Sequence, residues 1–229
     1  MINAKRSIEA CAAFYGDDSK AMKNYLLEGE KVALAMNNRG PISFDAEGNL
    51  AASIRNAYSE NGFYIFEGVL GKDELDDIKV DLDKMRSNFP IHPESSVDIN
   101  GEPALGVDSK ALTLVWSKPL GDPLGGTDLA NGRHQIKMFE PKAAEDSPVA
   151  SPFILLGSLQ FSEACLRTYA HPELLKIAES INGKDFAPFN EALFIKEPGI
   201  GAAVSWHQDG VTHWDSENFD EDIHGFNFM

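Results

Sequence analysis

The chain has 229 residues, 43% of them apolar, so it is long enough to bury a substantial core as one domain or a domain with a helical extension. Its 36 acidic and 20 basic residues give a formal net charge of −16, which argues against nucleic acid or an anionic membrane surface as a general partner. The only cysteines, Cys11 and Cys165, lie far apart and predict reduced thiols in a cytoplasmic protein.

Two further observations bear on targeting. Acidic residues follow the N-terminus before any apolar signal-peptide core appears, so we expect no secretion. The most apolar stretch, Phe153 to Leu159, is far shorter than the roughly 20 residues that cross a bilayer. We therefore expect no membrane span.

The first elements in chain order are helical. Residues 3–37 have apolar residues at helical spacing, and the pattern stops at Asn38-Arg39-Gly40-Pro41. A short helix from Ala51 leads into a predicted strand over Phe63 to Phe66. The next helix has two acidic residues in its first turn and ends at Pro90.

The middle of the chain is rich in turn-forming residues. Residues 91–132 predict long loops around one strand at Ala111 to Trp116. Arg133 to Phe139 alternates crudely between apolar and polar residues, as a strand does, and a loop rich in Pro and Ala follows it. The segment Leu159 to Ala170 again has helical spacing.

The last third contains the clearest local signals. His171 to Gly183 predicts a helix with Pro at its first position and Gly just past its end. Two strands follow, Ala192 to Glu197 and Ala203 to Asp209, joined by the turn-forming residues Pro198 to Gly201.

The second of these strands ends in a possible metal-binding motif. His207 and Asp209 lie two residues apart, so on an extended strand both side chains point to the same face. Two His and one carboxylate form the facial triad of non-haem Fe(II) enzymes, which leaves positions open for a bidentate co-substrate and dioxygen. The motif supplies two of those three ligands. A His and an Asp at this spacing are commonly ordinary surface residues. The surrounding sequence must therefore show whether these two bind a metal.

The surrounding segments resemble one family. Ala192 to Trp214 reads ALFIKEPGIGAAVSWHQDGVTHW, the helix His171 to Gly183 precedes it, and Asn61 to Asp81 lies near the start. In this order the three segments resemble the phytanoyl-CoA dioxygenase family, and the resemblance covers about two thirds of the chain.

The resemblance implies an α+β, mainly β fold: a double-stranded β-helix, or cupin-like jelly roll, with N-terminal helices. Residues 1–50 would be a helical extension, and residues 51–229 the N-terminal part of the jelly-roll domain. His207 and Asp209 would bind Fe(II), with 2-oxoglutarate as co-substrate. The implied activity is hydroxylation of a small-molecule or acyl substrate by dioxygen, with no nucleic acid or membrane as partner.

The resemblance also implies residues around the co-substrate. Gln135 is the best match to a polar residue on an early strand that contacts 2-oxoglutarate, and Leu193 matches an apolar residue lining the same pocket. Trp214 follows the motif and would border the substrate. A core position is the alternative for Leu193 and Trp214, and a solvated strand position is the alternative for Gln135. Strand alternation relative to Leu193 places Lys196 outside the pocket.

In the family, a second His ligand and an Arg that pairs with 2-oxoglutarate come from strands well beyond the motif. The chain ends in the apolar, strand-like run Gly225 to Met229, so we expect a C-terminal truncation that leaves the core incomplete. A half-built jelly roll would expose strand edges and aggregate readily. His213 and His224 are candidate replacement ligands, although both are more typical of loop residues.

Two other functions fit the same residues. The first is a non-catalytic jelly-roll module of the same family, which binds a ligand without turnover. The second is a hydrolase in which His207, Asp209 and His213 hold a metal that activates water.

Overall fold

The computed structural model describes residues 16–121, 143–188, 190–202, 204 and 225–229. The chain divides into two compact units, Met1–Val69 and Leu70–Met229. Within the described residues, every helix is too short or too polar to traverse a lipid bilayer. The predicted division of the chain at residue 50 stays a prediction.

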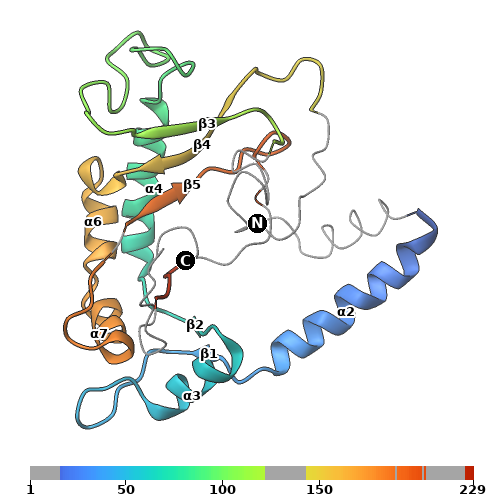
Figure 1. Cartoon of the computed structure of the whole chain (residues 1–229), viewed down its shortest axis with the longest axis vertical. Helices are drawn as coiled ribbons and strands as arrows, with labels where there is room; N and C mark the ends of the chain where they lie inside the picture. The colour runs from blue at the N-terminus through green and yellow to red at the C-terminus, as the bar shows by residue number, and fades with distance from the viewer. Residues whose placement is uncertain (1–15, 122–142, 189, 203, 205–224) are drawn as a thin grey trace, which may run out of the picture. The chain divides into compact units, whose positions relative to one another are not determined.

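The described part of the first unit, residues 16–69, contains two α-helices and a short parallel strand pair (Figure 1). Its elements are η1 (Gly16–Asp18), α2 (Ser19–Ala35), β1 (Arg39–Gly40), α3 (Ala52–Asn61) and β2 (Ile65–Phe66). The described part of the helix predicted over residues 3–37 is thus helical up to Ala35. None of the residues of α2 is buried.

A tight turn carries the chain from β1 into α3. Phe44 and Leu50 form an isolated antiparallel bridge, and the backbone N–H of Asn49 donates to Asp45 Oδ1 at 2.8 Å. Leu50, at the end of this turn, is buried in the interior and is only 1% exposed. α3 then ends at Gly62, whose φ of 79° is a conformation that glycine adopts readily.

The second unit contains a three-stranded antiparallel sheet in the order β3-β4-β5. Its elements are α4 (Lys72–Ser87), β3 (Leu114–Ser117), β4 (Ser151–Leu156), η2 (Ser158–Gln160), α6 (Glu163–Tyr169), α7 (Pro172–Asn182) and β5 (Ala192–Phe194). The helices predicted after Leu70 and over residues 171–183 are confirmed as α4 and α7. The helical spacing over residues 159–170 corresponds to η2 and α6, separated by a short break.

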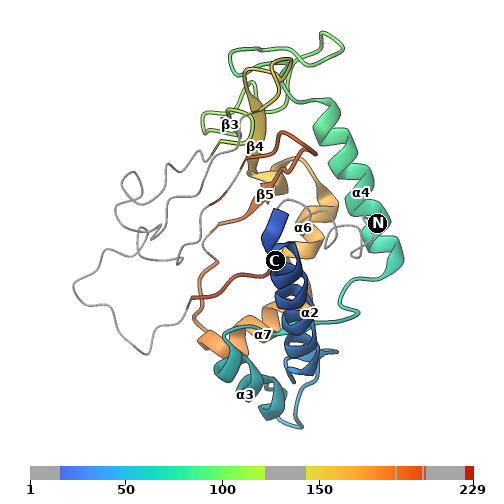
Figure 2. The same cartoon turned by 90° about the vertical axis from the view of Figure 1, so that its right-hand side faces the viewer.

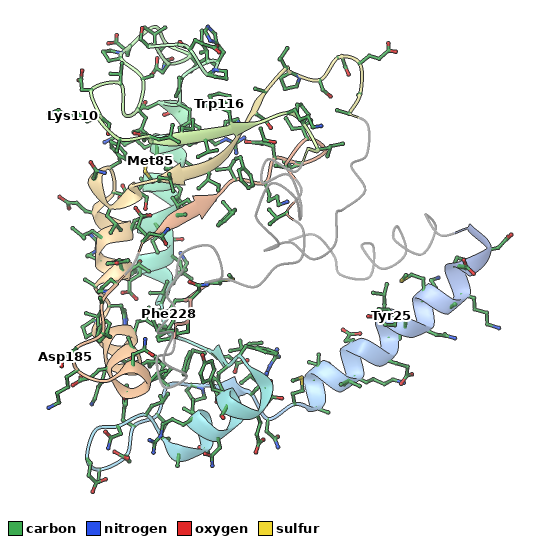
Figure 3. The ribbon with its side chains drawn as sticks, viewed as in Figure 1. Tyr25, Met85, Lys110, Trp116, Asp185 and Phe228 are labelled. Carbon is green, nitrogen blue, oxygen red and sulfur yellow. The ribbon has the colours of Figure 1, made fainter. Side chains whose placement is uncertain are left out.

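One face of the sheet packs against α4, as two perpendicular views show (Figures 1 and 2). The core between them is built on four buried residues, Met85, Leu114, Leu155 and Cys165. Met85 lies on α4 and Trp116 on β3, and both are labelled in Figure 3. Trp116 is half-buried and packs at the edge of this core.

The central strand, β4, lies where the sequence predicted a loop. The reason is Pro152, which has no N–H to donate to a strand partner and argues against a central strand. The register of β3 against β4 shifts between Val115 and Trp116, beside the position where Trp116 pairs with Pro152. An irregularity of this kind is where a sheet tolerates proline.

Candidate functional site

Most of the predicted site residues lie outside the described part of the chain: Gln135, His207, Asp209, His213, Trp214 and His224. Their roles stay predictions. Among the residues that the structure does describe, no group of three or more His, Cys, Asp or Glu side chains is placed to hold a metal ion. What the structure describes is the segment that leads toward His207: β5, the loop after it, and Ala202.

Adjacent residues of β5 have different surroundings. Leu193 pairs with Leu155 and packs, partly buried, against the core cluster that includes Met85. Phe194 pairs with Ile154 and is 58% exposed. Because successive side chains of a strand point to opposite faces, Leu193 belongs to the helix-covered face and Phe194 to the other face.

The face opposite α4 is apolar. By strand alternation it carries Val115, Ile154, Leu156 and Phe194. The ring of Phe153, which is 1% exposed, lies edge-on to that of Phe194, with 5.7 Å between the ring centroids and 80° between the planes. Strand alternation about Leu193 places Phe194 on this opposite face, so its position can be inferred from the sequence.

A compact turn follows β5, as the sequence predicted. The carbonyl oxygen of Glu197 accepts hydrogen bonds from the N–H groups of Ile200, at 3.3 Å, and Gly201, at 2.8 Å. Gly199 has a φ of 79°, which permits the turn. Ala202 comes next and is 1% exposed, so the chain re-enters the interior five residues before His207.

Lys196 is held on the outside of this turn. Its side chain is exposed, and its Nζ donates a hydrogen bond to the carbonyl oxygen of Ala202. The structure therefore places this cation at the base of the turn, and its ammonium group helps to close the segment from Lys196 to Ala202.

One protein-family model covers all of these segments. The model of the phytanoyl-CoA dioxygenase (PhyH) family matches residues 58–225, which is most of the chain. The chain belongs to the phytanoyl-CoA dioxygenase family. The match includes α4, the β3-β4-β5 sheet, the turn after β5 and the His207-Gln208-Asp209 motif. No curated protein and no solved structure matches the chain.

Membership supports an enzyme of the dioxygenase kind, because the family consists of oxygenases that typically use Fe(II) and 2-oxoglutarate. The observed fold has helices beside a small antiparallel sheet, and it is compatible with the fold of the phytanoyl-CoA dioxygenase family.

Proposed function

We propose that this protein is a non-haem Fe(II)- and 2-oxoglutarate-dependent dioxygenase that hydroxylates a small-molecule or acyl substrate. The observation that carries the proposal is the His207-Gln208-Asp209 motif inside the matched segment, residues 58–225. The motif alone would be a weak signal, and family membership gives it a chemical role.

The donor set fits the ion. His207 offers an imidazole nitrogen and Asp209 a carboxylate oxygen, the two ligand types of the facial triad that Fe(II) oxygenases use. Bound Fe(II) would supply dioxygen activation coupled to oxidative decarboxylation of 2-oxoglutarate. The task of His207 and Asp209 is to hold the metal while leaving positions free, so neither needs to transfer a proton.

The other assignments extend this proposal. Gln135 would contact 2-oxoglutarate, and Trp214 would border the substrate. Leu193, predicted to line the same pocket, packs on the helix-covered face of the sheet, so its assignment is the one that variants of Leu193 and Phe194 must test. The domain would be a jelly roll over residues 51–229, in which the β3-β4-β5 sheet forms part of one wall and α4 covers its outer face. The antiparallel order of the three strands and the single helix-covered face support that arrangement.

The experiment is an anaerobic titration of the protein with Fe(II) and 2-oxoglutarate, following the metal-to-ligand charge-transfer band. Asp209→Ala should abolish the band because it removes one iron ligand. Asp146→Ala, which changes an exposed carboxylate, is the matched control and should leave it unchanged.

Turnover provides a second measurement. The parent protein should form succinate from 2-oxoglutarate in air, and Asp209→Ala should form none. A folded, iron-loaded parent that shows neither the band nor succinate would overturn the dioxygenase proposal and favour the non-catalytic binding module.

A further inference from the structure

The long loop between α4 and β3 carries an exposed Asn-Gly step (Figure 1). Asp98 and Glu102 close a tight turn within this loop: the N–H of Asp98 donates to the carbonyl oxygen of Glu102 at 2.8 Å, and the N–H of Glu102 donates to Asp98 Oδ1 at 3.0 Å. Asn100 and Gly101 lie inside the turn, and both are exposed. An added Cβ at Gly101 would meet no atom within 4 Å, so nothing crowds this step.

An asparagine that precedes a glycine can lose ammonia without an enzyme, because glycine has no side chain to shield its backbone nitrogen. That nitrogen first gives its proton to hydroxide and then attacks the side-chain carbonyl carbon of the asparagine, forming a C–N bond. The side-chain nitrogen takes a proton from water and leaves as ammonia. Water then breaks one C–N bond of the cyclic imide, which leaves aspartate or isoaspartate. No oxidation or reduction takes place.

The chain repeats this dipeptide, and the copies differ in how firmly the glycine nitrogen is held. They are Asn61-Gly62, Asn100-Gly101, Asn131-Gly132 and Asn182-Gly183, of which the third lies outside the described residues. In each of the other three the glycine N–H donates to a carbonyl oxygen and must be released before it reacts. The distances are 2.7 Å from Gly62 to Tyr58, 2.9 Å from Gly183 to Glu179, and 3.1 Å from Gly101 to Asp98. The bond at Gly101 is therefore the longest of the three.

Asn61 is the most constrained of the three asparagines. Its Nδ2 donates to the carbonyl oxygen of Ala57 at 2.7 Å, and Ala57 is 7% exposed in α3. Asn182 ends α7, a helix anchored by Ile177, which is fully buried. Asn100 belongs to no helix, and an exposed turn opens at a lower free energy than a helical turn packed on a core.

We propose that Asn100 is a site of spontaneous modification: it deamidates to aspartate or isoaspartate in the folded protein, ahead of Asn182 and well ahead of Asn61. The product alters the turn. Asp98 is 3% exposed, and its Oδ1 accepts from the N–H of Asn100, at 2.7 Å, as well as from Glu102. A new carboxylate at position 100 repels this buried one, and isoaspartate adds a backbone carbon that displaces Glu102. The turn therefore loses its closing hydrogen bonds.

The test incubates the protein in mildly alkaline buffer and follows each Asn-Gly peptide by mass spectrometry, with fragmentation to distinguish isoaspartate from aspartate. Asn100 should deamidate about tenfold faster than Asn61, the factor that corresponds to one additional hydrogen bond of about 1.4 kcal/mol that must open at Asn61. Asn182 should fall between them. In urea that unfolds the chain the three rates should converge, because the dipeptide is the same and the hydrogen bonds are gone.

Asn100→Gln is the matched variant. It keeps the carboxamide but lengthens the side chain, so the attack would require a larger ring and the mass change at this position should disappear, with the rates at Asn61 and Asn182 unchanged. After equal incubation, a protease should cut residues 91–112 faster in wild type than in Asn100→Gln. A native rate at Asn100 no higher than that at Asn61, or an intact Asn100 after the unfolded chain has deamidated, would overturn the proposal. Neither outcome touches the proposed dioxygenase function, since no iron or 2-oxoglutarate enters the measurement.

Discussion

Ser162 shows how one hydroxyl links two helices. Its Oγ accepts from the N–H of Cys165, at 2.9 Å, and so caps the start of α6. The same hydroxyl donates to Asp81 Oδ2 on α4, at 2.7 Å, and Asp81 also accepts from the N–H of Ala164, at 3.2 Å. One carboxylate thereby completes the cap of a helix that lies 81 residues later in the sequence.

Replacing Ser162 should destabilise the second unit. Ser162→Ala removes the cap of α6 and one of the donors to Asp81, and loss of an N-cap typically costs about 1 kcal/mol of unfolding free energy. Urea denaturation monitored by circular dichroism measures the loss. Arg167→Ala is a suitable comparison, because its ion pair is exposed at both ends and should contribute less than about 1 kcal/mol.

Asp81 should make stability depend on pH in the acidic range. The Ser162 hydroxyl, followed by the Ala164 N–H, lowers the pKa of Asp81 below its ordinary value of 3.8. A lowered pKa in the folded state means that the carboxylate stabilises the fold above pH 3.8, and that this contribution is lost as pH falls through the lower folded value.

Asp81→Asn tests this sign directly. The difference in unfolding free energy between wild type and Asp81→Asn should be largest at neutral pH and should shrink as the pH falls below about 4. Urea denaturation curves at several pH values measure it. A difference that grows on acidification would show that the carboxylate is not stabilised in the folded protein.

At the scale of elements, β4 is the strand on which the sheet depends, because it pairs with both β3 and β5. Leu155 points into the core and is 1% exposed, while its neighbour Leu156 is half-buried on the other face. The two leucines therefore form a natural pair for comparison, since they share chemistry and strand but differ in environment.

Leu155→Ala should lower the unfolding free energy by roughly 2–5 kcal/mol, the range for truncating a fully buried leucine. Leu156→Ala should cost clearly less, because its side chain keeps part of its contact with solvent. Urea titration of both variants provides the comparison. Equal losses would mean that β4 does not present alternate faces as described.

The elements also show which sequence signals were sufficient. α4 and α7 were predictable because helical periodicity, acidic first turns, and Pro172 and Gly183 all agree locally. β4 was not, because Pro152 opposes a strand locally and is accommodated only through its irregular pairing with Trp116. Pairing of this kind depends on a strand more than 30 residues away.

In the whole molecule, the two faces of the sheet should contribute differently. Residues on the helix-covered face stabilise the fold, and residues on the opposite face are available to contact a ligand. Leu193→Ser should destabilise the protein because Leu193 packs against the core beneath α4. Phe194→Ser should lower the unfolding free energy less than Leu193→Ser does, because Phe194 is 58% exposed and loses mainly its ring contact with Phe153. Denaturation measures the first effect, and the Kd for 2-oxoglutarate shows which residue borders the co-substrate.

The outcome decides the predicted role of Leu193. A weaker affinity for 2-oxoglutarate in folded Leu193→Ser would support its place in the pocket. A weaker affinity in Phe194→Ser alone would transfer that role to the opposite face of β5.

The family, most of the helices, the turn after β5 and the donor set could be predicted without a structure, because each depends on residues close together along the chain. His207 and Asp209, for example, are recognisable from their spacing and neighbours. The folded chain was needed to show that β4 is the central strand, that Asp81 contributes to the cap of α6, and that Arg86 and Leu120 hold the turn after β5. These contacts join residues distant in sequence, and their free energy depends on distances and burial that no local pattern specifies.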